Sequence, residues 1–295
     1  MALMSHVATL VSNPARPAVD AAAIAKARTL LPNAISETLL KEGIAADIFF
    51  APGPGAQERE LSDLVRAALT PAPIDVVVQE TRYRRKKLFV ADMDSTMIDQ
   101  ECIDELADYA GLKAHVAAIT ERAMRGELPF EPALRERVAL LKGLPLSVIG
   151  ETIAEKITLA AGGSELIARL KANGVYTCLV SGGFTLFTNV IAAKLGFDEN
   201  RANELLIEND TLTGEVREPI LGRAAKLATL QELTARLDIR PEETIAIGDG
   251  ANDLDMITAA GLGVAIHAKP AVASAAQARI DHADLSAIIY CGGYV

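Results

Sequence analysis

Two acidic side chains stand directly after a short apolar run in the first third of the chain. Residues 88–91 are Leu-Phe-Val-Ala, and Asp92 and Asp94 follow them, spaced two apart. An apolar run of this length predicts a buried strand of a parallel sheet, whose carboxyl end is where such sheets place ligands. If the chain stays extended for two more residues, both carboxylates face one reacting centre. The alternative is a turn that simply favours aspartate.

A second acidic cluster follows another predicted strand. Residues 244–247 are Thr-Ile-Ala-Ile, and Asp249 and Asp253 come after them, ahead of a predicted helix at 254–260. Since like charges repel, the convergence of Asp92 with these two carboxylates indicates a bound divalent cation. All-oxygen ligands that leave room for a phosphate favour Mg²⁺ over zinc. No histidine or cysteine cluster competes, because the histidines are scattered: His6, His115, His267 and His282.

The stretch between the two clusters offers further groups for a phosphate. Residues 175–180 predict a strand that ends at Ser181, Gly182 and Gly183, where a hydroxyl and unobstructed backbone amides can hold phosphate oxygens. Lys226 lies in a predicted helix, and its ammonium can offset the charge of carboxylates and phosphate. Taken singly, the run Ser181-Gly182-Gly183 is an ordinary strand-to-helix turn, and Lys226 is a solvated lysine. Their order along one α/β pattern favours a common site.

Four short motifs resemble, in order and spacing, those of the haloacid dehalogenase superfamily. They are DMDST at residues 92–96, SGG at 181–183, Lys226 and GDGAND at 248–253. The resemblance covers about residues 86–290 and is closest to the phosphoserine phosphatase family, because MIDQE follows the first motif and cap positions of that family recur at Met124, Phe130 and Arg137. It implies an α/β fold with a Rossmannoid parallel sheet core and a small helical cap insertion at about 99–165.

The resemblance also implies a role for each motif residue. Asp92 is expected to be the nucleophile that forms an aspartyl-phosphate, and Asp94 the acid and base. Mg²⁺ is expected on the carboxylates of Asp92 and Asp249 and the backbone carbonyl of Asp94, with Asp253 ordering the coordination shell. The groups expected around the phosphoryl oxygens are Ser181, Gly182, Gly183, Lys226 and Asn252.

The cap is expected to select the substrate. Apolar residues spaced three and four apart at 101–110, and a proline near the start of 132–141, predict helices there. By resemblance, Glu101 grips the substrate ammonium and Arg137 its carboxylate, a pairing that suits a planar guanidinium. Met124 and Phe130 are expected to contact the substrate as well. Without the motifs, Glu101 and Arg137 are better explained as solvated charged residues on helices.

The function implied is Mg²⁺-dependent hydrolysis of O-phospho-L-serine to serine and phosphate, the last step of serine biosynthesis. The nearest alternative is the same chemistry on another small phosphomonoester, or phosphoryl transfer to an acceptor other than water. A regulatory protein with an inactive phosphatase fold is disfavoured by the intact acidic and lysine motifs. A receiver-type signalling module is disfavoured because it would lack the helical insertion.

The first eighty residues predict a separate small domain. The expected strands are 6–11, 35–40, 46–50 and 74–79, and the expected helices are 19–31 and 58–68. This βαββαβ order is ferredoxin-like, and it resembles the ACT-like regulatory domains of some bacterial phosphoserine phosphatases. Domain boundaries of 1–81 and 82–295 follow. An amino-acid effector site and a structural or homodimerising role are both open for this domain, since fold alone does not give function.

Composition restricts the partners of the chain. Its 295 residues are 50% hydrophobic with a formal net charge of −10, which argues against nucleic acid. The basic run 82–87 is short and predicts a linker or sheet edge. Three separated cysteines indicate buried free thiols in a reducing compartment, hence the cytoplasm. No run approaches the roughly 20 apolar residues of a membrane span.

Overall fold

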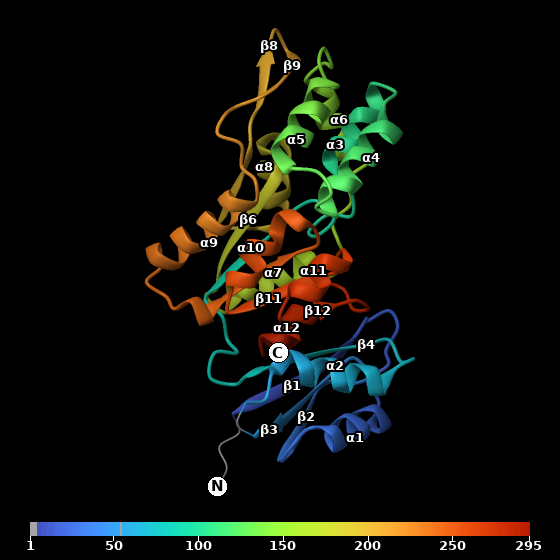
Figure 1. Ribbon diagram of the computed structural model, residues 1–295, viewed down its shortest axis with the longest axis vertical. Helices are drawn as coiled ribbons and strands as arrows, with labels where there is room; N and C mark the ends of the chain where they lie inside the picture. The colour runs from blue at the N-terminus through green and yellow to red at the C-terminus, as the bar shows by residue number, and fades with distance from the viewer. Residues whose placement is uncertain (1–4, 54) are drawn as a thin grey trace.

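The computed structural model describes residues 5–53 and 55–295. Its N-terminal part, at the bottom of Figure 1, is a four-stranded antiparallel sheet in the order β2-β3-β1-β4. The strands are β1 (His6–Ser12), β2 (Ser36–Lys41), β3 (Ala45–Phe50) and β4 (Ile74–Glu80), and the helices are α1 (Ala21–Leu30) and α2 (Glu58–Leu69). The predicted βαββαβ order is confirmed. The run Pro-Gly-Pro-Gly at 52–55 also predicts a loop before the second helix, but its Pro54 lies outside the described residues.

The two faces of this small sheet pack against different partners. Ala8 and Leu10 of β1 belong to the core shared with α1 and α2, whereas Val11 joins the core of the larger part of the molecule. Strand alternation places neighbouring residues on opposite faces, so the sheet separates its own helices from the rest of the protein.

The larger part is built on a six-stranded parallel sheet in the order β12-β11-β10-β5-β6-β7. The strands are β5 (Leu88–Ala91), β6 (Tyr176–Phe184), β7 (Glu199–Asn203), β10 (Thr244–Gly248), β11 (Leu262–Ile266) and β12 (Ala278–Ile280). The helices are α7 (Gly163–Ala172), α8 (Thr185–Leu195), α9 (Arg223–Arg236), α10 (Leu254–Ala259), α11 (Pro270–Ala275) and α12 (Ala287–Cys291), with short 3₁₀ turns η1 (Pro241–Glu243) and η2 (Ala251–Asp253). The predicted α/β class with a parallel sheet is confirmed.

Helices cover both faces of this sheet, and β5 is buried between them. Leu88 and Val90 pack into the core formed with α9 and α10, whereas Phe89 and Ala91 pack into the core formed with α7, α8 and α12. A strand buried on both faces must be apolar throughout, which is why the run at 88–91 carries no polar residue. The same alternation directs Asp92, the next residue, toward the α9 side.

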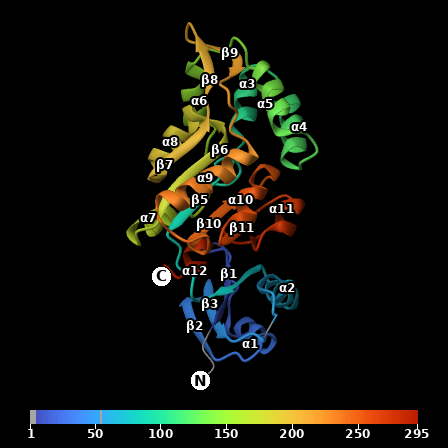
Figure 2. The ribbon, with the colours of Figure 1, turned by 60° about the vertical axis from the view of Figure 1, so that its left-hand side comes forward.

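A helical cap lies at the carboxyl end of the strands, at the top of Figure 1. Its helices are α3 (Cys102–Tyr109), α4 (Lys113–Met124), α5 (Phe130–Ala139) and α6 (Ser147–Glu155). The hairpin of β8 (Leu205–Glu208) and β9 (Thr211–Val216) stands beside them, as Figures 1 and 2 both show. It is tied to the cap by backbone hydrogen bonds between Leu212 and residues 143–144. The prediction for the cap did not include this hairpin.

Buried polar contacts connect the N-terminal sheet to the larger part. Asp75 of β4 accepts backbone hydrogen bonds from Asp281, His282 and Ala283 at 2.8–3.0 Å. Burial raises the pKa of Asp75, although the three N–H donors favour its charged form. Arg84, from the basic run, pairs with Asp47 at 2.7 Å. The run thus lies between the two parts, and its Arg84, whose side chain is 12% exposed, is a structural group.

Two general predictions concern the whole chain. The three cysteines, Cys102, Cys178 and Cys291, are free and buried. Within the described ranges, the structure has no helix that is both long and apolar enough to cross a membrane.

Candidate active site

Three neighbouring strands bring the predicted motifs to one edge of the sheet. β10, β5 and β6 are adjacent and parallel, so Asp249, Asp92 and Ser181 all lie near their carboxyl ends. Carboxylate oxygens of Asp92, Asp249 and Asp253 lie within 4.8 Å of one another, and all three residues are buried. Such a set of oxygen ligands fits a hard divalent cation such as Mg²⁺.

Lys226 of α9 is the cation that the structure places among these carboxylates. Its Nζ lies 2.6 Å from Asp92 Oδ1 and 2.6 Å from Asp253 Oδ1, and its side chain is 0% exposed. Burial opposes the ammonium charge, but Asp253 and Asp92 outweigh it and raise the pKa of Lys226. The interpretation as a solvated helix lysine is therefore wrong.

One lysine does not balance the acidic cluster. Burial raises the pKa of Asp92 well above its usual range, and Asp253, Asp249 and Asp94 raise it further against the opposing effect of Lys226. Burial and Asp253 raise the pKa of Asp249 to about 7, although Thr96 donates a hydrogen bond to it. The carboxylates thus repel one another in the absence of a further cation, which is the electrostatic condition for binding a metal.

The second acid of the first motif reaches the pocket from a turn. The chain leaves the sheet after Asp92, and the carbonyl of Met93 accepts hydrogen bonds from the amides of Thr96, Met97 and Ile98. Ser95 has a positive φ of 53° within this turn. The chain therefore does not stay extended through Asp94, yet Asp92 and Asp94 still line the same pocket.

Asp94 is fixed by two donors from opposite sides. Ser181 Oγ donates to its Oδ2 at 3.0 Å, and the amide of Cys102 donates to its Oδ1 at 2.8 Å. The Ser181 hydroxyl itself accepts the amide of Gly183 at 2.8 Å. The strand β6 runs on through the glycines to Phe184, so the SGG motif is the irregular end of a strand, with α8 beginning directly after it.

Both motif glycines lie closely packed against neighbouring side chains. A Cβ on Gly182 would lie 2.6 Å from Phe130 Cζ, and a Cβ on Gly183 would lie 2.8 Å from Asp94 Oδ2. Any side chain at either position would displace the cap aromatic ring or the carboxylate.

The cap closes the pocket over these groups. The predicted cap residues Glu101, Met124, Phe130 and Arg137 all line it, together with Asp92, Asp94, Gly182, Gly183 and Asn252. Ser181, Lys226, Asp249 and Asp253 are not part of this lining and lie behind it, connected through the contacts above. All thirteen predicted site residues are thus brought to the pocket wall or to its immediate support.

Arg137 is buried and Glu101 is half-buried in the pocket wall, so the solvated interpretation is wrong for both. Arg137 is 2% exposed, and it donates from Nε to Ala133 O at 3.0 Å and from Nη1 to Thr120 Oγ1 at 2.9 Å. Burial, Asp94 and Asp249 raise the pKa of Glu101 well above its usual range, although Ser95 donates to it. Burial lowers the pKa of Arg137, but a guanidinium stays charged.

Two supporting residues were missed by the sequence prediction. Thr96, whose hydroxyl binds Asp249 Oδ1 at 3.1 Å, belongs to the DMDST motif, so its position in the motif was an available signal. Thr120 holds both Arg137 and Asp104, but as one threonine of a helix it carried no signal. Asn252 Oδ1 is a buried atom without a hydrogen-bond partner among the described residues, which suits a residue that faces a ligand.

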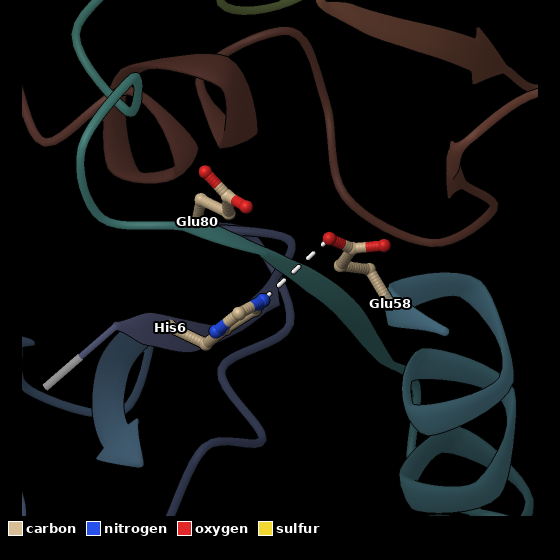
Figure 3. A group of neighbouring side chains, drawn as sticks. All are labelled: His6, Glu58 and Glu80. Carbon is tan, nitrogen blue, oxygen red and sulfur yellow. Dashed lines mark ion pairs between the residues drawn. The ribbon is translucent and has the colours of Figure 1, made fainter. Parts of the chain in front are cut away.

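A second group of side chains of the types that ligate metals lies in the N-terminal part. Figure 3 shows His6, Glu58 and Glu80 pointing toward one another from β1, α2 and β4. His6 Nε2 lies 3.5 Å from Glu58 Oε1, and the residues are partly or fully exposed. The sequence prediction treated His6 as isolated. An ion pair next to the first turn of α2 accounts for the contact, since acids are favoured at helix N-termini.

Comparisons with known proteins agree with this geometry. A family model described as haloacid dehalogenase-like hydrolase matches residues 89–258. A phosphoserine phosphatase of Albidiferax ferrireducens is 48% identical over 208 residues, which are 69% of this chain and 88% of that protein. One of Archaeoglobus fulgidus is 45% identical over 72% of this chain, but the match spans only 62% of its own length.

A solved structure gives the same result. It is titled as a phospho-aspartyl intermediate analogue of phosphoserine phosphatase, with a TM-score of 0.67 and 42% identity, and it covers 70% of this chain and 98% of that chain. The chain therefore belongs to the haloacid dehalogenase-like hydrolases and, among them, to the phosphoserine phosphatase family.

Proposed function

We propose that this protein is a Mg²⁺-dependent phosphoserine phosphatase that hydrolyses O-phospho-L-serine to L-serine and phosphate, as in the last step of serine biosynthesis. The observation that carries the proposal is one small pocket lined both by the acids Asp92 and Asp94 and by the cap charges Glu101 and Arg137. The first pair suits phosphoryl transfer, and the second suits an amino-acid head group.

Asp92 attacks the phosphorus, and the phosphoryl group passes to its carboxylate while the serine oxygen leaves. Asp94 gives a proton to that oxygen, and it later takes one from the water that hydrolyses the aspartyl-phosphate. The short distance from Lys226 to Asp92 supports charge neutralisation at the reacting carboxylate. The solved structure of a similar phosphatase is described as an analogue of a phospho-aspartyl intermediate, and this description supports the same intermediate here.

The residues present fit a Mg²⁺ ion. Asp92 and Asp249 would hold it, with Asp253 ordering the surroundings and the backbone carbonyl of Asp94 as a further ligand. When bound, the ion supplies positive charge to the phosphoryl oxygens. Ser181, the amides of Gly182 and Gly183, and Asn252 would hold those oxygens in place.

Arg137 and Glu101 would orient the substrate from the cap. Two of the guanidinium nitrogens of Arg137 are used by Ala133 and Thr120, whereas Nη2 makes none of the hydrogen bonds found among the described residues. A guanidinium held on one side and open on the other suits a carboxylate. Met124 and Phe130 would close the apolar side of the pocket.

A panel of phosphomonoesters tests the proposal directly. We expect phosphoserine to be hydrolysed best in Mg²⁺, and we expect excess chelator to abolish hydrolysis until Mg²⁺ is restored. Phosphate release is the measurement. Undiminished activity in chelator, or clear preference for a substrate without an amino-acid head, would contradict it.

Arg137→Ala should separate substrate recognition from chemistry. We expect its kcat/KM on phosphoserine to fall by at least about tenfold, the effect of losing one charge-assisted hydrogen bond. Hydrolysis of p-nitrophenyl phosphate, which has no carboxylate head, should change little. Arg135→Ala is the matched control, because Arg135 lies on the same helix but is exposed. Equal losses on the two substrates for Arg137→Ala would favour a broader phosphomonoesterase.

Metal binding should depend on pH in a defined direction. The folded pKa of Asp249, about 7, is above its ordinary value of 3.8, so the metal-free protein loses stability as pH rises between these values. The loss is at most about 4 kcal/mol, since one pKa unit is about 1.4 kcal/mol. Mg²⁺ binds the charged carboxylates and so offsets this loss of stability at high pH. We therefore expect Mg²⁺ to raise the Tm more at pH 8 than at pH 5, measured by thermal unfolding; an equal rise at both would contradict the Asp249 assignment.

Three further predictions belong to this proposal. They are an amino-acid effector at residues 1–81, a homodimer, and a location in the cytoplasm. The boundaries 1–81 and 82–295 stay predictions as well. Analytical ultracentrifugation and thermal unfolding, each with and without serine, test the first two, because an effector that acts on the N-terminal part should change the association state or the thermal stability.

A further inference from the structure

The carboxylate of Asp94 receives one hydrogen bond from the core and one from the cap. Ser181 of β6 donates to Oδ2 at 3.0 Å, and the backbone N–H of Cys102 donates to Oδ1 at 2.8 Å. Cys102 is the first residue of α3, and its side chain is buried. Asp94 therefore bridges the sheet and the first helix of the cap.

The two donors differ in how long they remain available during a reaction. A hydroxyl carries one hydrogen, so Ser181 cannot donate to Asp94 while it donates to a phosphoryl oxygen. The N–H of Cys102 stays available to Asp94, because the first amides of a helix have no acceptor within the helix that could compete for them. Glu101, at the N-cap position, makes no capping hydrogen bond with its side chain. Asp94 supplies that missing acceptor from eight residues away.

We propose that the backbone N–H of Cys102 is a positioning group for the acid and base Asp94. By holding Oδ1, it leaves Oδ2 directed at the leaving oxygen after Ser181 has turned to the phosphoryl group. In that step the Asp92 oxygen forms a bond to phosphorus and the bond to the serine oxygen breaks. The electron pair stays on the serine oxygen, which takes the proton of Asp94. The inference rests on the proposed function and adds that α3 must be docked for this proton transfer.

Proline at position 102 removes this donor with little other change. Proline is favoured at the first residue of a helix, where its missing N–H costs no helical hydrogen bond. The residue before a proline must be extended, and Glu101 already has φ −91° and ψ 110°. The thiol of Cys102 also lies against Asp94, and burial together with Asp94 raises its pKa. Cys102→Ala is therefore the matched control, since it removes the thiol and keeps the N–H.

The two variants should differ according to the leaving group. The constant kcat/KM covers the steps through leaving-group departure, and a serine alkoxide needs a proton to depart whereas p-nitrophenolate does not. We expect Cys102→Pro to lower kcat/KM on phosphoserine at least about tenfold relative to Cys102→Ala, and to lower it on p-nitrophenyl phosphate less than about threefold. Equal losses on both substrates, or equal activity of the two variants on phosphoserine, would overturn the inference.

A second variant keeps the test valid if proline disturbs the fold. Circular dichroism and Tm show whether Cys102→Pro is intact. If it is not, an α-hydroxy acid at position 102 replaces the N–H by an oxygen and keeps the helix geometry, and the same contrast between substrates is expected. If the wild-type protein were inactive on phosphoserine but active on another alkyl phosphate, only the proposed function would be overturned. Cys102→Pro and Cys102→Ala would then be compared on that alkyl phosphate. Inactivity on every alkyl phosphate would overturn both.

Discussion

Asp92→Asn should abolish turnover while the protein stays folded. The amide has no charge with which to attack phosphorus, so kcat should fall by at least about a thousandfold. The fold should tolerate the change, because burial and the neighbouring Asp253 already raise the pKa of Asp92 and disfavour its charge. Without metal, the Tm of the variant should equal or exceed that of the wild type. Phosphate release and thermal unfolding are the measurements.

The covalent step can be tested separately on the wild-type protein. A beryllium fluoride phosphate mimic should attach to Asp92, visible as electron density on its carboxylate. Asp108→Asn is a control variant, because Asp108 is an exposed carboxylate of α3 and its loss should not change activity. An adduct on another residue, or substantial activity in Asp92→Asn, would show that the nucleophile is assigned wrongly.

Lys226→Met should remove activity and destabilise the protein as well. Its ammonium lies 2.6 Å from both Asp92 and Asp253, so the variant leaves two buried carboxylates without their partner. Removing one partner of a buried ion pair costs about 3–5 kcal/mol of unfolding free energy. Urea unfolding without metal should show this loss, and phosphate release should show a fall in kcat larger than for any substitution in the cap.

The double variant Lys226→Met/Asp253→Asn distinguishes the two effects. It removes one of the stranded charges, so it should regain part of the lost stability and none of the lost activity. If the double variant were no more stable than Lys226→Met, the destabilisation would come from packing around the methionine. Unchanged activity in Lys226→Met would contradict a role for its charge in the reaction.

Local sequence patterns determined the elements and the family. The apolar run at 88–91 predicted a strand buried on both faces, and β5 is such a strand because each residue contacts one of two cores. Apolar spacing predicted the cap helix α3, and a proline near the helix start predicted α5, each to within about two residues. These features depend on short-range periodicity, which a single segment carries by itself. The four motifs identified the family for the same reason, since their residue types and order are properties of the chain.

Only the tertiary structure decided which of these elements meet. The pairing of β5 with both β10 and β6 brings Thr96 beside Asp249, 153 positions away. Burial of Lys226 follows from the packing of α9 on the sheet, and a hydropathy pattern does not separate a buried lysine from a solvated one.

The same limit applies to the cap and the N-terminal part. The hairpin of β8 and β9 joins the cap from a distant segment through backbone hydrogen bonds, which leave no side-chain pattern to detect. Asp75 belongs to no sequence motif, and its three backbone partners lie at 281–283, near the other end of the chain. Sequence periodicity reports the face on which a residue lies, whereas the identity of the opposite surface depends on contacts between segments far apart in the chain.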